Sequence, residues 1–212
     1  MPAGPMSSGL PNEEKANVRK AFAKGEVSRE ELIKAESKAY HGEGTCTFYG
    51  TANSNQIIME IMGVHIPGAA FVHPNSDLRH AYNVLAVEQA VKINSKGRDV
   101  RPIGKIIDER SFVNAIIGLL ATGGSTNHTL HLPAMAAAAG IKLLWEDFDD
   151  LSKIIPLLSK VYPNGSSDIN QFHAAGGVSF IIGELLNNGL LDGSAKTIWG
   201  ENLFDYVSEP IL

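Results

Sequence analysis

The chain has 212 residues, of which 44% are hydrophobic and 19% charged, a composition typical of a folded globular domain. Its 18 basic and 23 acidic residues leave a net charge of -5, which disfavours a nucleic-acid partner because phosphate binding needs a concentrated positive field. No apolar run approaches the roughly 20 residues that a membrane span needs, and the N-terminus lacks the charged and apolar regions of a signal peptide.

The N-terminal region favours short helices separated by glycine. The first ten residues are rich in Pro, Gly and Ser and predict a loop. Residues 12–39 are polar and predict two helices that are broken at Gly25. Ser28 is the expected N-cap of the second helix, because Glu31 follows three residues later and completes a capping box.

Two longer helices follow. Residues 52–62 place isoleucine and methionine side chains on one helical face, and Gly63 is the expected end of that helix. Asp77 can cap a helix that continues to about residue 93, in which Leu78 and Val91 belong to the apolar positions.

The second half of the chain also favours helices, although two segments are typical of strands. Residues 141–145 are short and apolar, which predicts a buried strand, and residues 69–72 are a second candidate. The expected helices cover residues 111–120, 125–139, 146–161 with a break at Pro156, and 175–188. We therefore predict a helix-rich, layered α/β/α domain, with an all-α bundle as the alternative that the pattern leaves open.

The only cysteine, Cys46, lies in a glycine-rich segment directly before a predicted helix. The N-terminus of that helix favours a thiolate or an anionic metal–sulfide centre, and the hydroxyls of Thr45, Thr47 and Tyr49 add hydrogen-bond donors. One cysteine cannot hold a cluster, so the residues alone favour a small packed side chain over a ligand. A lone cysteine also fits a reducing cytoplasm.

A second polar segment, Ser125, Thr126 and Asn127, follows a diglycine and starts a predicted helix. Such a terminus can bind a carboxylate or phosphate, but the same residues also serve as an ordinary helix cap, and the pattern does not separate these readings. No lysine follows the glycines, so the segment is not a nucleotide-binding P-loop.

Histidines and isolated carboxylates elsewhere give weaker signals. His128 and His131 are three residues apart, but no third ligand has a recognisable spacing, so we favour capping or core histidines over zinc. Glu60 and Asp108 have no carboxylate partner, so each is interpreted as a solvated or capping residue.

Residues 44–56, GTCTFYGTANSNQ, resemble the cluster-cysteine segment of the dihydroxy-acid and phosphogluconate dehydratase family. The sequence after the cysteine resembles the phosphogluconate branch. Further similar segments are residues 2–11 (PAGPMSSGLP), 120–132 (LATGGSTNHTLHL), 161–165 (VYPNG) and 173–177 (HAAGG). The resemblance therefore covers essentially the whole chain.

The resemblance implies a hydro-lyase that dehydrates 6-phospho-D-gluconate, a phosphorylated sugar acid, to 2-dehydro-3-deoxy-6-phosphogluconate in the Entner–Doudoroff pathway. It implies an iron–sulfur cluster, 4Fe-4S rather than 2Fe-2S, that acts as Lewis acid on the departing hydroxyl, with Cys46 as one ligand. It further implies a cytoplasmic homodimer, and magnesium in the full-length enzyme. Ser125, Thr126 and Asn127 are the candidate substrate-binding residues, and no residue here matches the catalytic base.

Members of this family are much longer and supply two further cluster cysteines upstream. Residues 1–212 are therefore expected to be part of the N-terminal, cluster-binding domain, without the C-terminal domain and inactive in isolation. Two alternatives stay open: a dehydratase for a dihydroxy acid or unphosphorylated sugar acid, and a non-catalytic folding or oligomerisation domain in which Cys46 is incidental.

Overall fold

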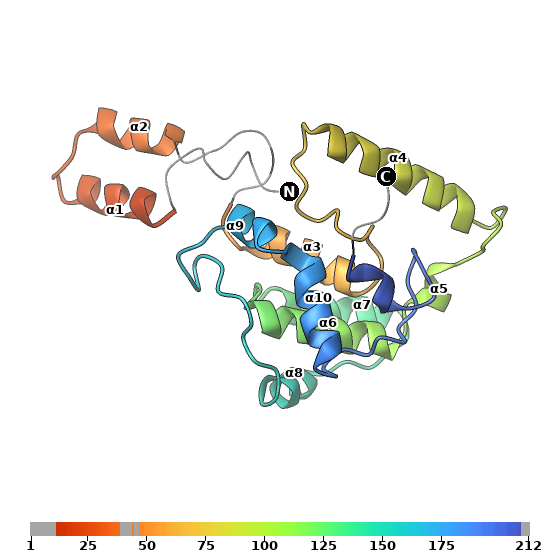
Figure 1. Ribbon diagram of the computed structural model, residues 1–212. Helices are drawn as coiled ribbons and strands as arrows, with labels where there is room; N and C mark the ends of the chain where they lie inside the picture. The colour runs from red at the N-terminus through yellow and green to blue at the C-terminus, as the bar shows by residue number, and fades with distance from the viewer. Residues whose placement is uncertain (1–11, 39–43, 45–46, 209–212) are drawn as a thin grey trace.

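The computed structural model describes residues 12–38, 44 and 47–208, which form helices joined by turns (Figure 1). The helices are α1 (Asn12–Ala23), α2 (Arg29–Lys38), α3 (Thr51–Ile61), α4 (Asp77–Ile93), α5 (Ile103–Ile106), α6 (Glu109–Thr122), α7 (His128–Ala138), α8 (Trp145–Ser152), α9 (Ile169–Ala174), α10 (Gly177–Asn187) and the 3-10 helix η1 (Leu203–Tyr206). None of the helices in these ranges is both long enough and apolar enough to cross a membrane.

Helices α1 and α2 form a hairpin whose turn follows the sequence prediction. The Ser28 backbone N–H donates to the Glu31 carboxylate at 2.7 Å, and the Glu31 N–H donates to Ser28 Oγ at 3.2 Å, so the expected capping box is confirmed. The hairpin lies apart from the other helices in Figure 1. The core clusters of the described residues contain no side chain from either helix.

The centre of the molecule is the contact between α3 and α6. The apolar residues predicted on one face of α3, including Ile57 and Ile61, are fully buried, as is Ile116 on α6. Gly118 lets the two helices approach closely, because a Cβ atom at that position would lie 2.4 Å from Ile61 Cδ1. Burial of apolar surface drives this packing, and the absence of a side chain at Gly118 sets the distance between the two helices.

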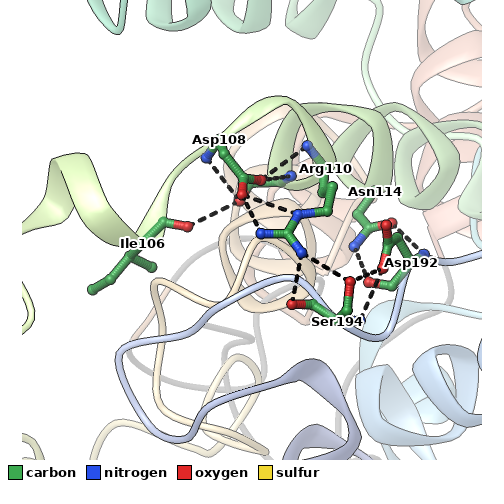
Figure 2. Close-up of polar contacts among 7 residues, drawn as sticks. Ile106, Asp108, Arg110, Asn114, Asp192 and Ser194 are labelled. Atoms are coloured by element: carbon green, nitrogen blue, oxygen red, sulfur yellow. Dashed lines mark hydrogen bonds and ion pairs between the residues drawn. The ribbon is translucent and has the colours of Figure 1, made fainter.

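A polar network anchors the start of α6 to the turn after α10 (Figure 2). Asp108 caps α6 by accepting from the Arg110 N–H at 3.0 Å, as the capping interpretation predicted. Arg110 Nη1 in turn donates to Ser194 Oγ at 2.9 Å. Asn114 is fully buried and pairs with the backbone of Asp192, to which its amide donates and from which it accepts, both at 2.9 Å.

Helix α4 has the expected length, but its cap differs from the prediction. Ser76, not Asp77, is the N-cap, and its hydroxyl accepts from the Arg79 N–H at 3.1 Å. Leu78 and Val91 are exposed. The side of α4 that carries Tyr82 packs against a small apolar cluster, so only part of the apolar surface of this helix is buried.

Both predicted strands are wrong. Residues 69–72 are buried, but side chains rather than a neighbouring strand satisfy their backbone: the Ala70 N–H donates to Glu60, and the Ala69 and Val72 carbonyls accept from Arg79. Burial of a short apolar segment therefore does not require a sheet when other groups supply its hydrogen bonds.

Residues 141–144 form a short link rather than a strand, and Trp145 already belongs to α8. Helix α8 ends at Ser152, well before Pro156, so the helix predicted to residue 161 is also wrong. The described residues contain no strand, only an isolated bridge between Val161 and Ser167. The helix-rich prediction is confirmed, while the layered α/β/α arrangement is not found in this part of the chain.

Candidate functional site

Cys46 lies outside the described residues, but the segment that follows it is well defined. Thr47 is buried, and its carbonyl accepts from the Ile169 N–H at 3.3 Å. The Tyr49 N–H donates to the Tyr162 carbonyl at 2.9 Å. The chain directly after the cysteine is therefore held against residues more than a hundred positions away, near the start of α9.

The Tyr49 side chain is buried and forms a hydrogen bond within the core, so its hydroxyl is not available to a ligand. Its hydroxyl lies 2.6 Å from Thr122 Oγ1, and Thr122 donates its own proton to the Gly118 carbonyl at 2.7 Å. Tyr49 must therefore be the donor to Thr122. Burial raises the pKa of Tyr49 above its ordinary value, so the phenol stays neutral. The expectation that this hydroxyl is available to a cluster or substrate is wrong.

The two polar segments identified in the sequence meet in space. Thr51 Oγ1, in the first turn of α3, lies 2.8 Å from Ser125 Oγ and accepts from Asn127 Nδ2 at 2.7 Å. Thr126 and Asn127 are exposed to solvent. A Cβ atom on Gly124 would lie 3.0 Å from Ser54 Cβ, so a glycine is needed for this close approach.

The buried side chain of His128 supports the contact of Thr51 with Ser125 and Asn127, which we call the junction. The ring is almost completely buried, and Nε2 lies 3.0 Å from Ser54 Oγ, which also accepts from the Ser125 N–H at 3.2 Å. Ser54 donates to the Gly50 carbonyl at 2.9 Å, so the ring donates to Ser54. Burial lowers the pKa of His128, followed by the effect of neighbouring His131. His128 is a core histidine, as predicted.

Neither helix start at the junction has a side-chain cap. Gly50, the N-cap of α3, offers no side chain, and Asn127, the N-cap of α7, makes no capping hydrogen bond. The first N–H groups of α7, those of His128, Thr129 and Leu130, already donate to the carbonyls of residues 125–127, whereas the start of α3 presents the positive end of its helix dipole. The positive end of α3, together with the hydroxyls of Thr51 and Ser125, suits a carboxylate or phosphate.

Glu60 was interpreted as a solvated or capping residue, and the solvated reading is wrong. The side chain is fully buried, and its carboxylate accepts from the Gly68 N–H at 2.7 Å and the Ala70 N–H at 3.2 Å. Together with His173 it lines a cavity of about 120 Å³. Because its partners lie eight and ten residues away in a turn, no sequence pattern identifies this role.

The metal-ligand chemistry of the described residues is limited. They contain no group of three His, Cys, Asp or Glu side chains that could hold a metal ion. The whole sequence has one cysteine, whereas an iron–sulfur cluster is held by several thiolates. The residues of this chain alone therefore do not fit a complete cluster site.

The family model and the curated relatives that match this chain point to the same family. The family model described as "Dihydroxy-acid/6-phosphogluconate dehydratase N-terminal" matches residues 1–206. Phosphogluconate dehydratase of Rhizobium meliloti is 58% identical over 206 residues, and that of Escherichia coli K12 is 53% identical over 212 residues. Dihydroxy-acid dehydratase of Hydrogenobaculum is 33% identical over 215 residues.

These alignments cover nearly all of this chain but a minor part of each relative. They include 97% of the chain and 34% of the Rhizobium protein, 100% and 35% for the Escherichia protein, and 97% and 38% for the Hydrogenobaculum protein. The chain thus spans about a third of the length of the curated relatives it matches.

Proposed function

Because the chain belongs to the dihydroxy-acid/6-phosphogluconate dehydratase N-terminal family, we propose that it forms the N-terminal part of a hydro-lyase acting on 6-phospho-D-gluconate. The observation that carries the proposal is the high identity, along the entire chain, to proteins named phosphogluconate dehydratase. Identity to the relative named dihydroxy-acid dehydratase is much lower, which favours the phosphorylated sugar acid over a dihydroxy acid.

We propose that Ser125, Thr126 and Asn127 bind an oxyanion of this substrate. The support is geometric: these residues meet Thr51 at two uncapped helix starts, and Thr126 and Asn127 are open to solvent. Hydroxyl and amide donors beside the positive end of α3 together stabilise a bound carboxylate or phosphate without requiring a lysine or arginine. His128 positions this surface through Ser54 and does not itself contact the substrate.

We propose further that Cys46 contributes one thiolate to an iron–sulfur cluster, 4Fe-4S in the family's pattern, whose other ligands lie outside this chain. The chemistry of a lone cysteine permits no more than this, so no reaction step is assigned to the cluster. The same proposal includes a cytoplasmic homodimer for the complete enzyme and magnesium bound outside this chain. A sheet contributed by other residues would restore the layered α/β/α arrangement.

The substrate proposal is tested with the complete open reading frame that encodes this chain. Purified anaerobically, the enzyme should dehydrate 6-phosphogluconate with a kcat/KM at least about a hundredfold above that for gluconate or a dihydroxy acid. A preference for either unphosphorylated substrate would replace this function with the sugar-acid or dihydroxy-acid alternative. The 212-residue chain, reconstituted with iron and sulfide, should show no turnover.

The ligand proposal is tested by Cys46→Ser in the same complete enzyme. Iron content, visible absorbance and activity should all fall, because a hydroxyl does not replace a thiolate ligand of the cluster iron. Ser152→Ala, at an exposed position of α8, is the control and should change none of them. Unchanged iron content and activity in Cys46→Ser would favour the non-catalytic domain in which the cysteine is incidental.

The substrate-binding proposal is tested by Ser125→Ala and Asn127→Ala in the complete enzyme. Loss of ground-state contacts to an oxyanion should raise KM by about tenfold with a smaller change in kcat. Ser152→Ala again serves as control. An unchanged KM in both variants would show that the junction only packs helices.

A further inference from the structure

A second polar cavity lies at the other end of α3, between α4 and the turn that follows α3. Its volume is about 330 Å³, and its polar lining comes from His65, Arg79, Tyr82, Asn83 and Gln89. The 11 residues of α3 separate it from the junction at Ser125 by roughly 16 Å of helix. It is therefore distinct from the proposed substrate-binding surface.

Arg79 brings a positive charge to this cavity, and no carboxylate of the described residues forms an ion pair with it. One terminal nitrogen, Nη2, donates to the Ala69 and Val72 carbonyls. The Nε–H is shielded from solvent and has no acceptor. Among the described residues, Asp77, in the same helical turn, makes no ion pair with Arg79. Burial lowers the pKa of the Arg79 guanidinium. A half-buried cation with unused donors favours an anion.

The remaining walls suit a compact polar ligand. Gln89 is buried and donates to the Ile198 carbonyl, which fixes the back of the cavity. Asn83 is exposed and lines the opening, where its amide can donate to a ligand. The nearest buried carboxylate is Glu60, 3.9 Å from His65 Nδ1, but it already accepts from two backbone N–H groups and lies outside the cavity lining.

We propose that this cavity binds a small organic oxyanion, a phosphate monoester or a carboxylate, with Arg79 as its charge partner and Asn83 as a neutral donor. A guanidinium presents paired N–H donors that match the oxygens of either group. The cavity has room for a compact head group next to an apolar wall formed by Ala86 and Ile93. This inference does not depend on the proposed substrate or on Cys46.

The test is calorimetric titration of the 212-residue chain with inorganic phosphate, 6-phosphogluconate and gluconate. Binding that Arg79→Gln weakens but Ser125→Ala leaves unchanged belongs to this cavity: a preference for phosphate and 6-phosphogluconate over gluconate then identifies a phosphate site, and similar binding of the two sugar acids a carboxylate site. Arg79→Gln should weaken binding by about tenfold or more, since a charge-assisted pair is lost. Arg98→Gln, which removes the same charge from an exposed position, should stay within about twofold.

Asn83→Asp provides a second variant that keeps the side-chain shape and removes none of the hydrogen bonds of Arg79. Its carboxylate would compete with the ligand for the guanidinium, so binding should fall by about tenfold. Asn187→Asp, at the exposed end of α10, is the matched control. Failure of all three probes to bind, or equal binding by wild type and Asn83→Asp, would overturn the proposal even if Arg79→Gln does not fold.

Discussion

Helices α6 and α4 are both long and rich in apolar residues, yet they use those residues differently. On α6 nearly every position from Ser111 to Thr122 is buried, and Ile116 is 0% exposed. On α4 the buried residues are Tyr82 and Gln89, and Val87 is 64% exposed. Helical periodicity predicts both helices, but it does not predict whether another element covers the apolar face.

The largest effect should come from a cavity in the α3–α6 contact. Ile116→Ala removes buried methyl and methylene groups from a position without solvent access, and should lower the free energy of unfolding by about 2–5 kcal/mol. Urea denaturation at pH 7 measures the change. A loss below about 1 kcal/mol would mean that α6 is not the centre of the stable structure.

A smaller effect is expected where α6 is anchored to the turn after α10. Asn114→Ala removes a buried amide and leaves the partly buried Asp192 N–H and carbonyl without their side-chain partner, which should cost about 1–3 kcal/mol. The control is Asn187→Ala on the exposed end of α10, with an expected change within about 0.5 kcal/mol. Equal effects of the two substitutions would show that the hydrogen bonds between Asn114 and the Asp192 backbone do not stabilise the fold.

The cap of α6 should add a pH-dependent contribution. Burial acts to raise the pKa of Asp108, but hydrogen bonds and the charge of Arg110 outweigh it and hold the pKa below the ordinary value of 3.8. The stabilisation is therefore present above pH 3.8 and is lost as pH falls through the lowered pKa.

Asp108→Ala should accordingly cost about 1 kcal/mol at pH 7, and the difference from wild type should shrink in urea titrations below pH 3.8. Asp108→Asn keeps a good cap and removes the titration, so it separates the two contributions. A difference that stays constant down to pH 2 would contradict the role of the carboxylate charge.

The smallest effect is expected on the outer side of α4. Val87→Ala removes two methyl groups that already contact solvent, and alanine favours helix, so stability should change by less than about 0.5 kcal/mol. A loss approaching that of Ile116→Ala, measured on the same chain, would show that this face of α4 is covered in solution and would remove the contrast between the two helices.

Local signals predicted most helix boundaries. Ser28 and Glu31 are three residues apart, and Gly63 and Gly123 adopt the positive φ values of 73° and 60° that end α3 and α6. These features depend only on neighbouring residues. The strand predicted at residues 69–72 failed because the side chains of Glu60 and Arg79, seven to ten residues away, satisfy its backbone, which periodicity does not report.

The site was predicted only in parts. The sequence identified the segment after Cys46 and the segment from Ser125 to Asn127 separately, but Thr51 and Ser125 are 74 residues apart and nothing in their spacing predicts that they meet. The buried roles of Glu60 and Ser54 were missed for the same reason. The position of Cys46 lies outside the described residues, so its role as a ligand stays a prediction.

The hydrogen bond from Tyr49 to Thr122 gives this protein a built-in optical reporter. A phenolate absorbs in the near ultraviolet at longer wavelength than a phenol, and burial holds the pKa of Tyr49 above the ordinary value of 10.0. The contribution of this tyrosine to stability is thus complete below pH 10.0 and declines at higher pH. Burial also raises the pKa of Tyr206, so the alkaline difference spectrum between wild type and Tyr49→Phe would isolate the Tyr49 signal and record when the segment after Cys46 separates from α6.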